Sequence, residues 1–204
     1  MRDILLIGGM GAGKTSLAIA MRNQDAGINY VPMALYTAYS PLSLLDTHPD
    51  LLAMPKPGFL AAVTNPPEEI GEFHREEMDD IGQRIIEAYG GTIMAEIALA
   101  ARKDNARNVI DNISKASNVS YLKEKGLYIV GLDCSFDTQV ERRMRDHKGM
   151  DPEDRPHLEE QVRRTNEHFE IDDILKLTHT IIDTESIGLD DYPSVAEDIL
   201  SAVR

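Results

Sequence analysis

Residues 8–15 read GGMGAGKT and fit the spacing G-x-x-x-x-G-K-[ST] without exception. Glycines let a backbone curl around an anion so that successive N–H groups point inward. An apolar run precedes the motif and a helical pattern follows it, which is the context that phosphate binding requires. We expect Lys14 to reach the β- and γ-phosphates of a nucleotide and the Thr15 hydroxyl to bind Mg²⁺. The predicted nucleotide-binding residues here are Gly8, Gly9, Met10, Gly11, Ala12, Gly13, Lys14, Thr15 and Ser16.

A phosphate loop of this kind needs a further carboxylate near its metal ion, usually at the end of a neighbouring strand. Asp111 ends the apolar run at residues 108–111. We therefore expect it to organise Mg²⁺ through water or to accept the proton of a substrate. Asp133, which ends the next apolar run, is the second candidate. The structural alternative for Asp111 is a turn or helix-capping aspartate.

Positive charge gathers in residues 141–155, which read ERRMRDHKGMDPEDR. Phosphoryl transfer spreads negative charge over the transferred oxygens, and an arginine placed there lowers the barrier. Glycine and proline in this stretch predict a small lid at about residues 143–157. The alternative is a solvated helix face with ion pairs between successive turns. We expect at most two of its arginines to matter, and Arg142 is the first candidate.

Composition limits the classes of protein that fit. The chain has 204 residues and a formal net charge of −14. The length predicts a single domain over residues 1–204, and the acidic balance speaks against nonspecific nucleic-acid binding. Cys134 is the only cysteine, so an intrachain disulfide is excluded and a cytoplasmic location is the default. No apolar run is long enough for a membrane span, so we expect no membrane partner.

Five apolar runs predict the strands that position these residues, at 3–7, 28–33, 108–111, 127–132 and 179–183. Helical patterns lie between and after them, including long ones at residues 68–88 and 157–177. Many prolines in residues 36–67 predict short helical pieces or loops. Alternating strands and helices predict a three-layer α/β/α fold with a parallel five-stranded sheet. The active site of such a fold lies at the carboxyl ends of the strands.

Taken in order, these motifs resemble the P-loop kinases of the deoxynucleoside monophosphate kinase and dephospho-CoA kinase type. In that family a helix runs into a Tyr-Gly turn, a strand ends in an Asp-Gly-Ile-Arg-like turn, and the lid opens with Glu-Arg and reaches an Asp-Pro. The matching features here are Tyr89-Gly90, Val109 to Ser114, Glu141-Arg142 and Asp151-Pro152. The likeness covers residues 1–23 and about 81–184. It implies ATP and Mg²⁺ as cofactors, Arg142 on the ATP phosphates, and adenine near Thr184 to Ser186.

The acceptor side departs from this family, and we place the acceptor-binding region at about residues 34–90. Ser114 stands where the family has the arginine of its Asp-Gly-Ile-Arg turn. A monophosphate acceptor needs fixed cations, and arginine provides bidentate contacts. The cations between residues 28 and 90 are Lys56, Arg75 and Arg84.

We therefore predict ATP-dependent phosphoryl transfer to a small nucleotide-like acceptor, with a (deoxy)nucleoside monophosphate as the favoured one. Lys14, Asp111 and Arg142 are the predicted catalytic residues, Thr15 and Asp111 the predicted metal site, and Arg142 and Thr184 further nucleotide contacts. One alternative is a kinase for a coenzyme precursor, a nucleoside or a modified base. Another is a regulatory NTPase, which would bind or hydrolyse the nucleotide without any acceptor. GTP as the donor and a homodimer are also compatible with the sequence.

Overall fold

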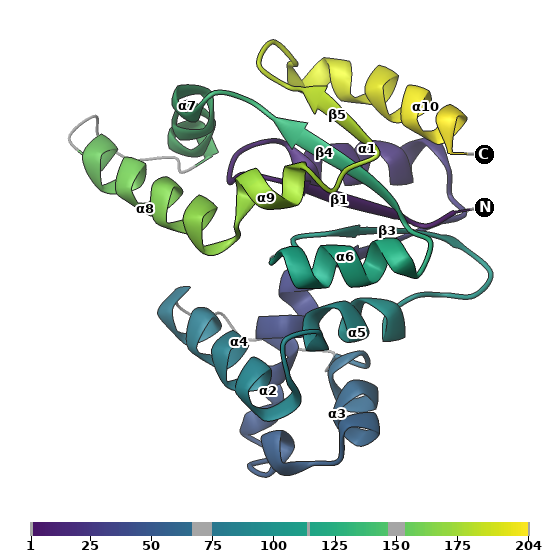
Figure 1. The fold of residues 1–204 in the computed structure, drawn as a ribbon, viewed down its shortest axis with the longest axis vertical. Helices are drawn as coiled ribbons and strands as arrows, with labels where there is room; N and C mark the ends of the chain where they lie inside the picture. The colour runs from purple at the N-terminus through teal and green to yellow at the C-terminus, as the bar shows by residue number, and fades with distance from the viewer. Residues whose placement is uncertain (1, 67–74, 114, 147–153, 204) are drawn as a thin grey trace.

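The structure of the chain is a computed structural model that describes residues 2–66, 75–113, 115–146 and 154–203, apart from the side chains of residues 75 and 76. Strands and helices follow one another in the order drawn in Figure 1. The strands are β1 (Ile4–Gly8), β2 (Ile28–Pro32), β3 (Arg107–Asp111), β4 (Tyr128–Asp133) and β5 (Thr180–Asp183). The helices up to the third strand are α1 (Lys14–Gln24), η1 (Leu35–Tyr39), α2 (Ser40–Leu45), η2 (Leu51–Ala53), α3 (Lys56–Val63), α4 (Arg75–Tyr89) and α5 (Ile93–Ala100). Those after it are α6 (Ala116–Glu124), α7 (Phe136–Asp146), α8 (Arg155–His168), α9 (Ile171–Leu175), η4 (Leu189–Asp191) and α10 (Tyr192–Ala202).

The strands form one parallel sheet in the order β2-β3-β1-β4-β5, which confirms the predicted five-stranded sheet. β1 lies at the centre, where Leu5 pairs with Ile110 of β3 and with Ile129 of β4. A central parallel strand is buried on both faces, which is why its sequence is an unbroken apolar run. The phosphate loop follows β1 and Asp111 ends β3, so the sheet brings both to the same edge.

Helices cover both faces of the sheet and complete three layers (Figure 1). Side chains alternate along β1, so Leu5 and Ile7 face one layer while Ile4 and Leu6 face the other. α1 and α10 pack against each other on the side of Ile4 and Leu6. α5, α6 and α9 pack on the side of Leu5 and Ile7. The α/β/α layering expected from the alternating sequence pattern is therefore confirmed.

Residues 34–66 form short helical pieces, as their prolines predict. Pro41 and Pro57 lie in the first turns of α2 and α3, where the missing N–H costs no helical hydrogen bond. Phe59 of α3 stacks on Tyr89 of α4 with ring centroids 4.2 Å apart. Phe59 also belongs to the same buried cluster as Leu5, so this region packs on the core of the sheet.

The helix predicted for residues 157–177 was wrong in one respect, because α8 and α9 are separate helices joined at Glu170. Glu170 has φ 53°, in the left-handed region, so a right-handed helix cannot continue through it. Its carboxylate accepts a hydrogen bond from the Ala116 N–H at 2.9 Å and pairs with Lys115 at 3.4 Å. These contacts join Glu170 to a segment 54 positions away in the sequence and stabilise the break between the two helices. The helical pattern of residues 157–177 therefore does not reveal it.

Part of the predicted site lies outside the described residues, namely residues 67–74 of the predicted acceptor region, Ser114, and residues 147–153 in the middle of the predicted lid. The flanks of that lid are described: residues 143–146 end α7, and Arg155 begins α8. Among the helices of the described ranges, none has the length and apolar content that crossing a membrane requires.

Candidate active site

The phosphate loop runs from the end of β1 into the first turn of α1. Gly13 lies just before α1 with φ 95°, a conformation that glycine adopts far more readily than other residues. A Cβ atom on Gly13 would lie 1.8 Å from the Tyr192 hydroxyl oxygen, so α10 also leaves no room for a side chain. The loop amides and the positive end of α1 can therefore converge on one point, which suits an anion.

Lys14 lies partly buried in the wall of this loop. Its Nζ atom donates hydrogen bonds to the carbonyl oxygens of Gly8 and Gly9, both at 2.9 Å. The pKa of Lys14 is lowered to about 8, chiefly by burial and to a smaller extent by the charge of Arg143, against the opposing effect of Asp111. Because burial disfavours its charge, the ammonium group would be stabilised by an anionic phosphate in the loop.

Asp111 ends β3 beside the loop and is fully buried. Its Oδ2 atom accepts hydrogen bonds from the Thr15 hydroxyl at 3.3 Å and from the Tyr30 hydroxyl at 2.7 Å. Burial raises the pKa of Asp111, while these hydrogen bonds and the charge of Lys14 lower it. Burial and the Asp111 carboxylate raise the pKa of Tyr30, so the phenol keeps its proton and acts as the donor. The structure thus brings together the predicted Lys14, Thr15 and Asp111.

These residues fit a Mg²⁺ ion that is shared with a nucleotide. Mg²⁺ keeps several waters and is usually held by one or two carboxylates together with substrate phosphates. Asp111 Oδ1 is buried and has no hydrogen-bond partner in the described part of the chain, which leaves it free for a metal-bound water. The Thr15 hydroxyl donates a hydrogen bond to Asp111, and the lone pairs of its oxygen remain able to bind a metal ion. Substrate phosphates and water molecules would complete the ligand set of such an ion.

The side chain of Arg142 in α7 contacts a main-chain atom of the phosphate loop. Its guanidinium donates to the carbonyl oxygen of Gly11 at 3.3 Å, to that of Ile187 at 3.2 Å and to the Thr184 hydroxyl at 3.2 Å. A further hydrogen bond joins it to the Thr184 carbonyl oxygen. Arg142 therefore fastens the segment after β5 to the loop. Its contact with ATP phosphates, which the family resemblance implies, stays a prediction.

Thr184, the residue predicted on the adenine side, is fully buried. Its hydroxyl lies within hydrogen-bond distance of the carbonyl oxygens of Ala12 at 3.2 Å and Asp133 at 3.1 Å. Residues 187–189 of the same segment line the cleft instead. The predicted contact of a nucleotide with Thr184 stays a prediction.

A cleft of about 750 Å³ opens in front of the loop. Lys14, Thr15 and Ser16 line its donor end, together with Arg142, Arg143 and Arg145 of α7. Apolar side chains form much of the remaining wall, namely Met33, Ala38, Met78, Ile86, Met94 and Ile113. Polar lining residues are Thr37, Tyr39, Asp79, Gln83, Asn112 and Asp146, and α8 contributes Arg164, Thr165 and His168. The cleft therefore combines arginines beside the phosphate loop with apolar surface that a second molecule could contact.

Arg84 does not belong to this wall. Met78, Gly82 and Ile86 mark the face of α4 that lines the cleft. Arg84 lies two positions from Gly82 and from Ile86, roughly 200° around the helix. Its side chain is half exposed and pairs with Asp80 at 3.7 Å. Of the two arginines that the sequence offers for an acceptor phosphate, Arg84 therefore points away, and the side chain of Arg75 lies outside the described part of the chain.

Several residues of the site were not found by sequence reasoning, namely Tyr30, Tyr192, Gln139 and Asn166. The parallel register pairs Tyr30 with Val109, two residues before Asp111, and so places the phenol beside the carboxylate. The sequence shows a polar residue in a strand but not this register. In the sequence, Gln139 and Asn166 look like ordinary polar residues on helices. The structure shows that both lie against the phosphate loop.

Comparisons with known proteins place the fold. No protein-family model matches the chain, and no curated protein matches it in sequence. A shikimate kinase from Acinetobacter baumannii, in complex with shikimate, is similar over 100% of this chain and 93% of its own, with 19% identity and a TM-score of 0.55. A shikimate kinase from Bacteroides thetaiotaomicron covers 98% of both chains, with 15% identity and a TM-score of 0.54. An uncharacterised protein from Eubacterium ventriosum covers 100% of this chain and 98% of its own, with 13% identity and a TM-score of 0.54.

At these identities the likeness shows the fold alone. The expected α/β/α fold is confirmed, because these solved structures share it over nearly the whole chain. The closer resemblance to deoxynucleoside monophosphate kinases and dephospho-CoA kinases stays a prediction. The chain has the three-layer fold that these shikimate kinases also have.

Proposed function

We propose that the chain transfers the γ-phosphoryl group of ATP to a small acceptor bound in the same cleft. The observation that supports this most is the form of the cleft. Lys14, Thr15 and the neighbouring Asp111 lie at the phosphate loop, and apolar side chains from other elements line the same cleft. This apolar surface could hold an acceptor beside the phosphates of the nucleotide.

Each residue of the donor end has a physical task in this proposal. Lys14 and the loop amides hold the phosphates, and Mg²⁺, when bound, neutralises charge on the β- and γ-phosphates. Asp111 orients a metal-bound water or the acceptor hydroxyl, because its Oδ2 atom is held by Thr15 and Tyr30 while Oδ1 is left over. Little covalent chemistry falls to the protein, so positioning and electrostatics supply most of the rate enhancement.

A nucleoside or deoxynucleoside monophosphate is the first candidate for the acceptor, bound between the region of residues 34–90 and α8. The apolar wall offers surface for a planar base, and Thr37 and Gln83 can hydrogen-bond its polar edge. Because Arg84 points away, the phosphate of such an acceptor would have to be bound from the other side of the cleft. Arg143 of α7 and Arg164 of α8 line the cleft and could bind it, although Arg164 also pairs with Glu160 at 2.6 Å.

An acceptor that carries a hydroxyl but no phosphate is the second candidate, such as a nucleoside, a coenzyme precursor or a modified base. The outward orientation of Arg84 favours it, because it removes from the cleft one of the arginines that could bind a phosphate dianion. The fold shared with shikimate kinases, one of them in complex with shikimate, is compatible with this second class.

A screen of nucleosides, monophosphates and coenzyme precursors, read by ADP release from Mg·ATP, tests the proposal. A kinase releases ADP only when the right acceptor is present. The variant Lys14→Ala should lose that release and keep the fold, as judged by its circular dichroism. ADP release at the same rate with and without every acceptor would contradict the proposal and indicate a regulatory NTPase.

A further inference from the structure

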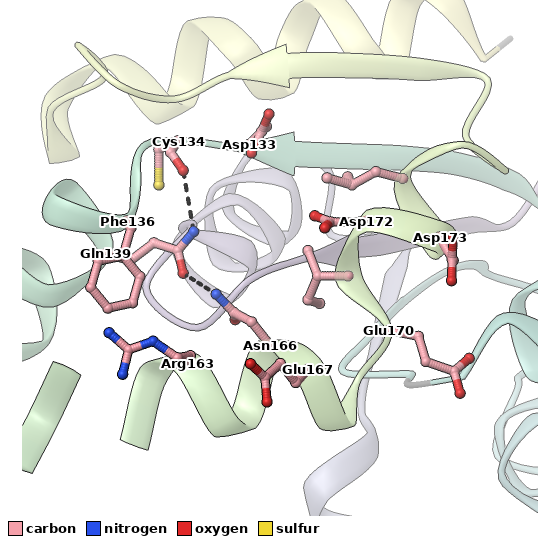
Figure 2. A pocket seen from close by; sticks show the side chains of 12 residues that line it. Asp133, Cys134, Phe136, Gln139, Arg163, Asn166, Glu167, Glu170, Asp172 and Asp173 are labelled. Atoms are coloured by element: carbon pink, nitrogen blue, oxygen red, sulfur yellow. Dashed lines mark hydrogen bonds between the residues drawn. The ribbon is translucent and has the colours of Figure 1, made fainter. Parts of the chain in front are cut away.

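The amide side chains of Asn166 and Gln139 connect the phosphate loop to α8 and α7. Figure 2 shows the hydrogen bond between these two side chains. The Met10 N–H of the loop donates to Asn166 Oδ1 at 3.1 Å. Asn166 Nδ2 donates to Gln139 Oε1 at 2.8 Å, and Gln139 Nε2 donates to the Cys134 carbonyl oxygen at 3.2 Å. A continuous chain of hydrogen bonds therefore runs from the loop, through α8 and α7, to the residue that follows β4.

The two ends of this chain fix its direction. The Met10 N–H can only donate, and the Cys134 carbonyl oxygen can only accept. Each side chain between them must therefore accept on one side and donate on the other. An amide does both, whereas an ionised carboxylate only accepts. Asn166 and Gln139 are thus not interchangeable with Asp and Glu, although the side chains have the same shape.

Packing holds the same part of the loop in place. Gln139 is 6% exposed, and a Cβ atom on Gly9 would lie 2.7 Å from its Oε1 atom, so the loop lies directly against this side chain. The Met10 side chain packs on a small buried cluster made by α7 and α8, which consists of Val140, Leu158 and Val162. Main-chain and side-chain contacts of Met10 therefore come from the same two helices.

α8 lies between the substrate cleft and a second cavity of about 580 Å³. Arg164 and Thr165 line the cleft, whereas Asn166 and Glu167 line the second cavity (Figure 2). Successive residues of a helix are about 100° apart, which explains why neighbours in sequence reach different cavities. The helix that carries Arg164 at the cleft is thus the one that contacts Met10 of the loop.

We propose that Asn166 and Gln139 are positioning residues for the nucleotide, because they fix the Met10 peptide so that the loop amides after it face the phosphates. This inference rests on the proposed function, since it assumes that the loop binds nucleotide phosphates. A loop rich in glycine has many conformations to lose when it closes on an anion. Holding Met10 in advance lowers that entropy cost, and the gain appears as affinity.

The test measures the dissociation constants of Mg·ATP and Mg·ADP by titration calorimetry, together with hydrogen exchange of the Met10 amide by NMR. Asn166→Leu removes both hydrogen bonds while keeping the branching and the number of side-chain heavy atoms. It should weaken Mg·ATP binding by about five- to tenfold, the worth of the one hydrogen bond that holds Met10. The same variant should expose the Met10 amide to exchange. Glu167→Gln, at the next position and in the same cavity, is the matched control and should change neither quantity.

Two further variants keep the test independent of folding. Asn166→Asp retains the size of the side chain and the acceptor for Met10, but places a carboxylate oxygen against Gln139 Oε1, so it should also weaken binding. Gln139→Met removes the other amide at similar volume. Because the hydrogen bonds form one chain, the double variant Asn166→Leu with Gln139→Met should bind no more weakly than the more affected single variant.

An unchanged dissociation constant in folded Asn166→Leu and Asn166→Asp would overturn the inference. A lower melting temperature with unchanged nucleotide affinity would assign the amide chain to stability alone and overturn it as well. Failure of the unaltered chain to bind Mg·ATP is a different outcome, because it would overturn the proposed function and this inference together.

Discussion

The pH dependence of nucleotide binding follows from the environment of Lys14. Its pKa is lowered from 10.5 to about 8, chiefly by burial. Phosphates of a nucleotide bring negative charge to the ammonium group and raise that pKa again in the complex. Binding therefore selects the protonated form. Affinity should be constant below the pKa of the free protein and should fall as the pH rises through about 8, with one proton taken up on binding.

The expected size of this effect can be worked out from the same value. About one pH unit above the pKa, roughly a tenth of the free protein carries a charged Lys14, so apparent affinity should fall roughly tenfold for each further unit. The decline ends at the pKa of the complex. Burial raises the pKa of Cys134 and of Tyr30, so neither group titrates early in this window. The terminal phosphate of the nucleotide ionises below it, with a pKa of about 6.

Calorimetric titration with Mg·ADP from about pH 7 to about pH 9.5 measures the affinity, and two buffers of different ionisation enthalpy give the number of protons taken up. Lys14→Met removes the titrating group at similar chain length and should bind weakly, without dependence on pH in this range. Constant affinity of the unaltered chain, without proton uptake, would refute the reasoning. Lys14 would then either keep its charge throughout or fail to contact the phosphates.

Three further predictions concern the carboxylate and the arginines. Asp111→Asn should keep Mg·ATP binding but lower turnover by about 100-fold or more, and a changed melting temperature alone would instead indicate a turn aspartate. Arg142→Ala should lower kcat on the order of 100- to 1,000-fold if Arg142 meets the transferred phosphoryl group, whereas Arg143→Ala should do much less, because its direction differs by about 100° around α7. Equal small effects of the two variants in steady-state kinetics would contradict the catalytic role predicted for Arg142. Arg164→Ala should raise the KM of a phosphorylated acceptor by about tenfold, and Arg84→Ala on the outer face of α4 should not; if neither matters, an uncharged acceptor is favoured.

The sequence by itself determined the fold class and the donor end of the site. Residues 8–15 are contiguous, and their action depends on main-chain amides and spacing, so their chemistry can be predicted without distant contacts. A continuous apolar run indicates a strand that is buried on both faces. Several such runs that alternate with helical patterns are enough to predict a parallel sheet between two layers of helices. The place of Asp111 at the end of such a run was also sufficient to put it beside the loop.

The tertiary structure decided everything that depends on the register and rotation of separate elements. Tyr30 reaches Asp111 across 81 positions of sequence because of the strand register, and Asn166 reaches Met10 across 156 because α8 packs on the loop. The helical pattern does not show that Arg142 contacts the Gly11 carbonyl oxygen of the loop, since adjacent side chains differ in direction by about 100° and packing selects the rotation. Local sequence fixes which groups an element carries, but the direction in which each points is set by burial against distant segments, whose combined free energy outweighs local preference.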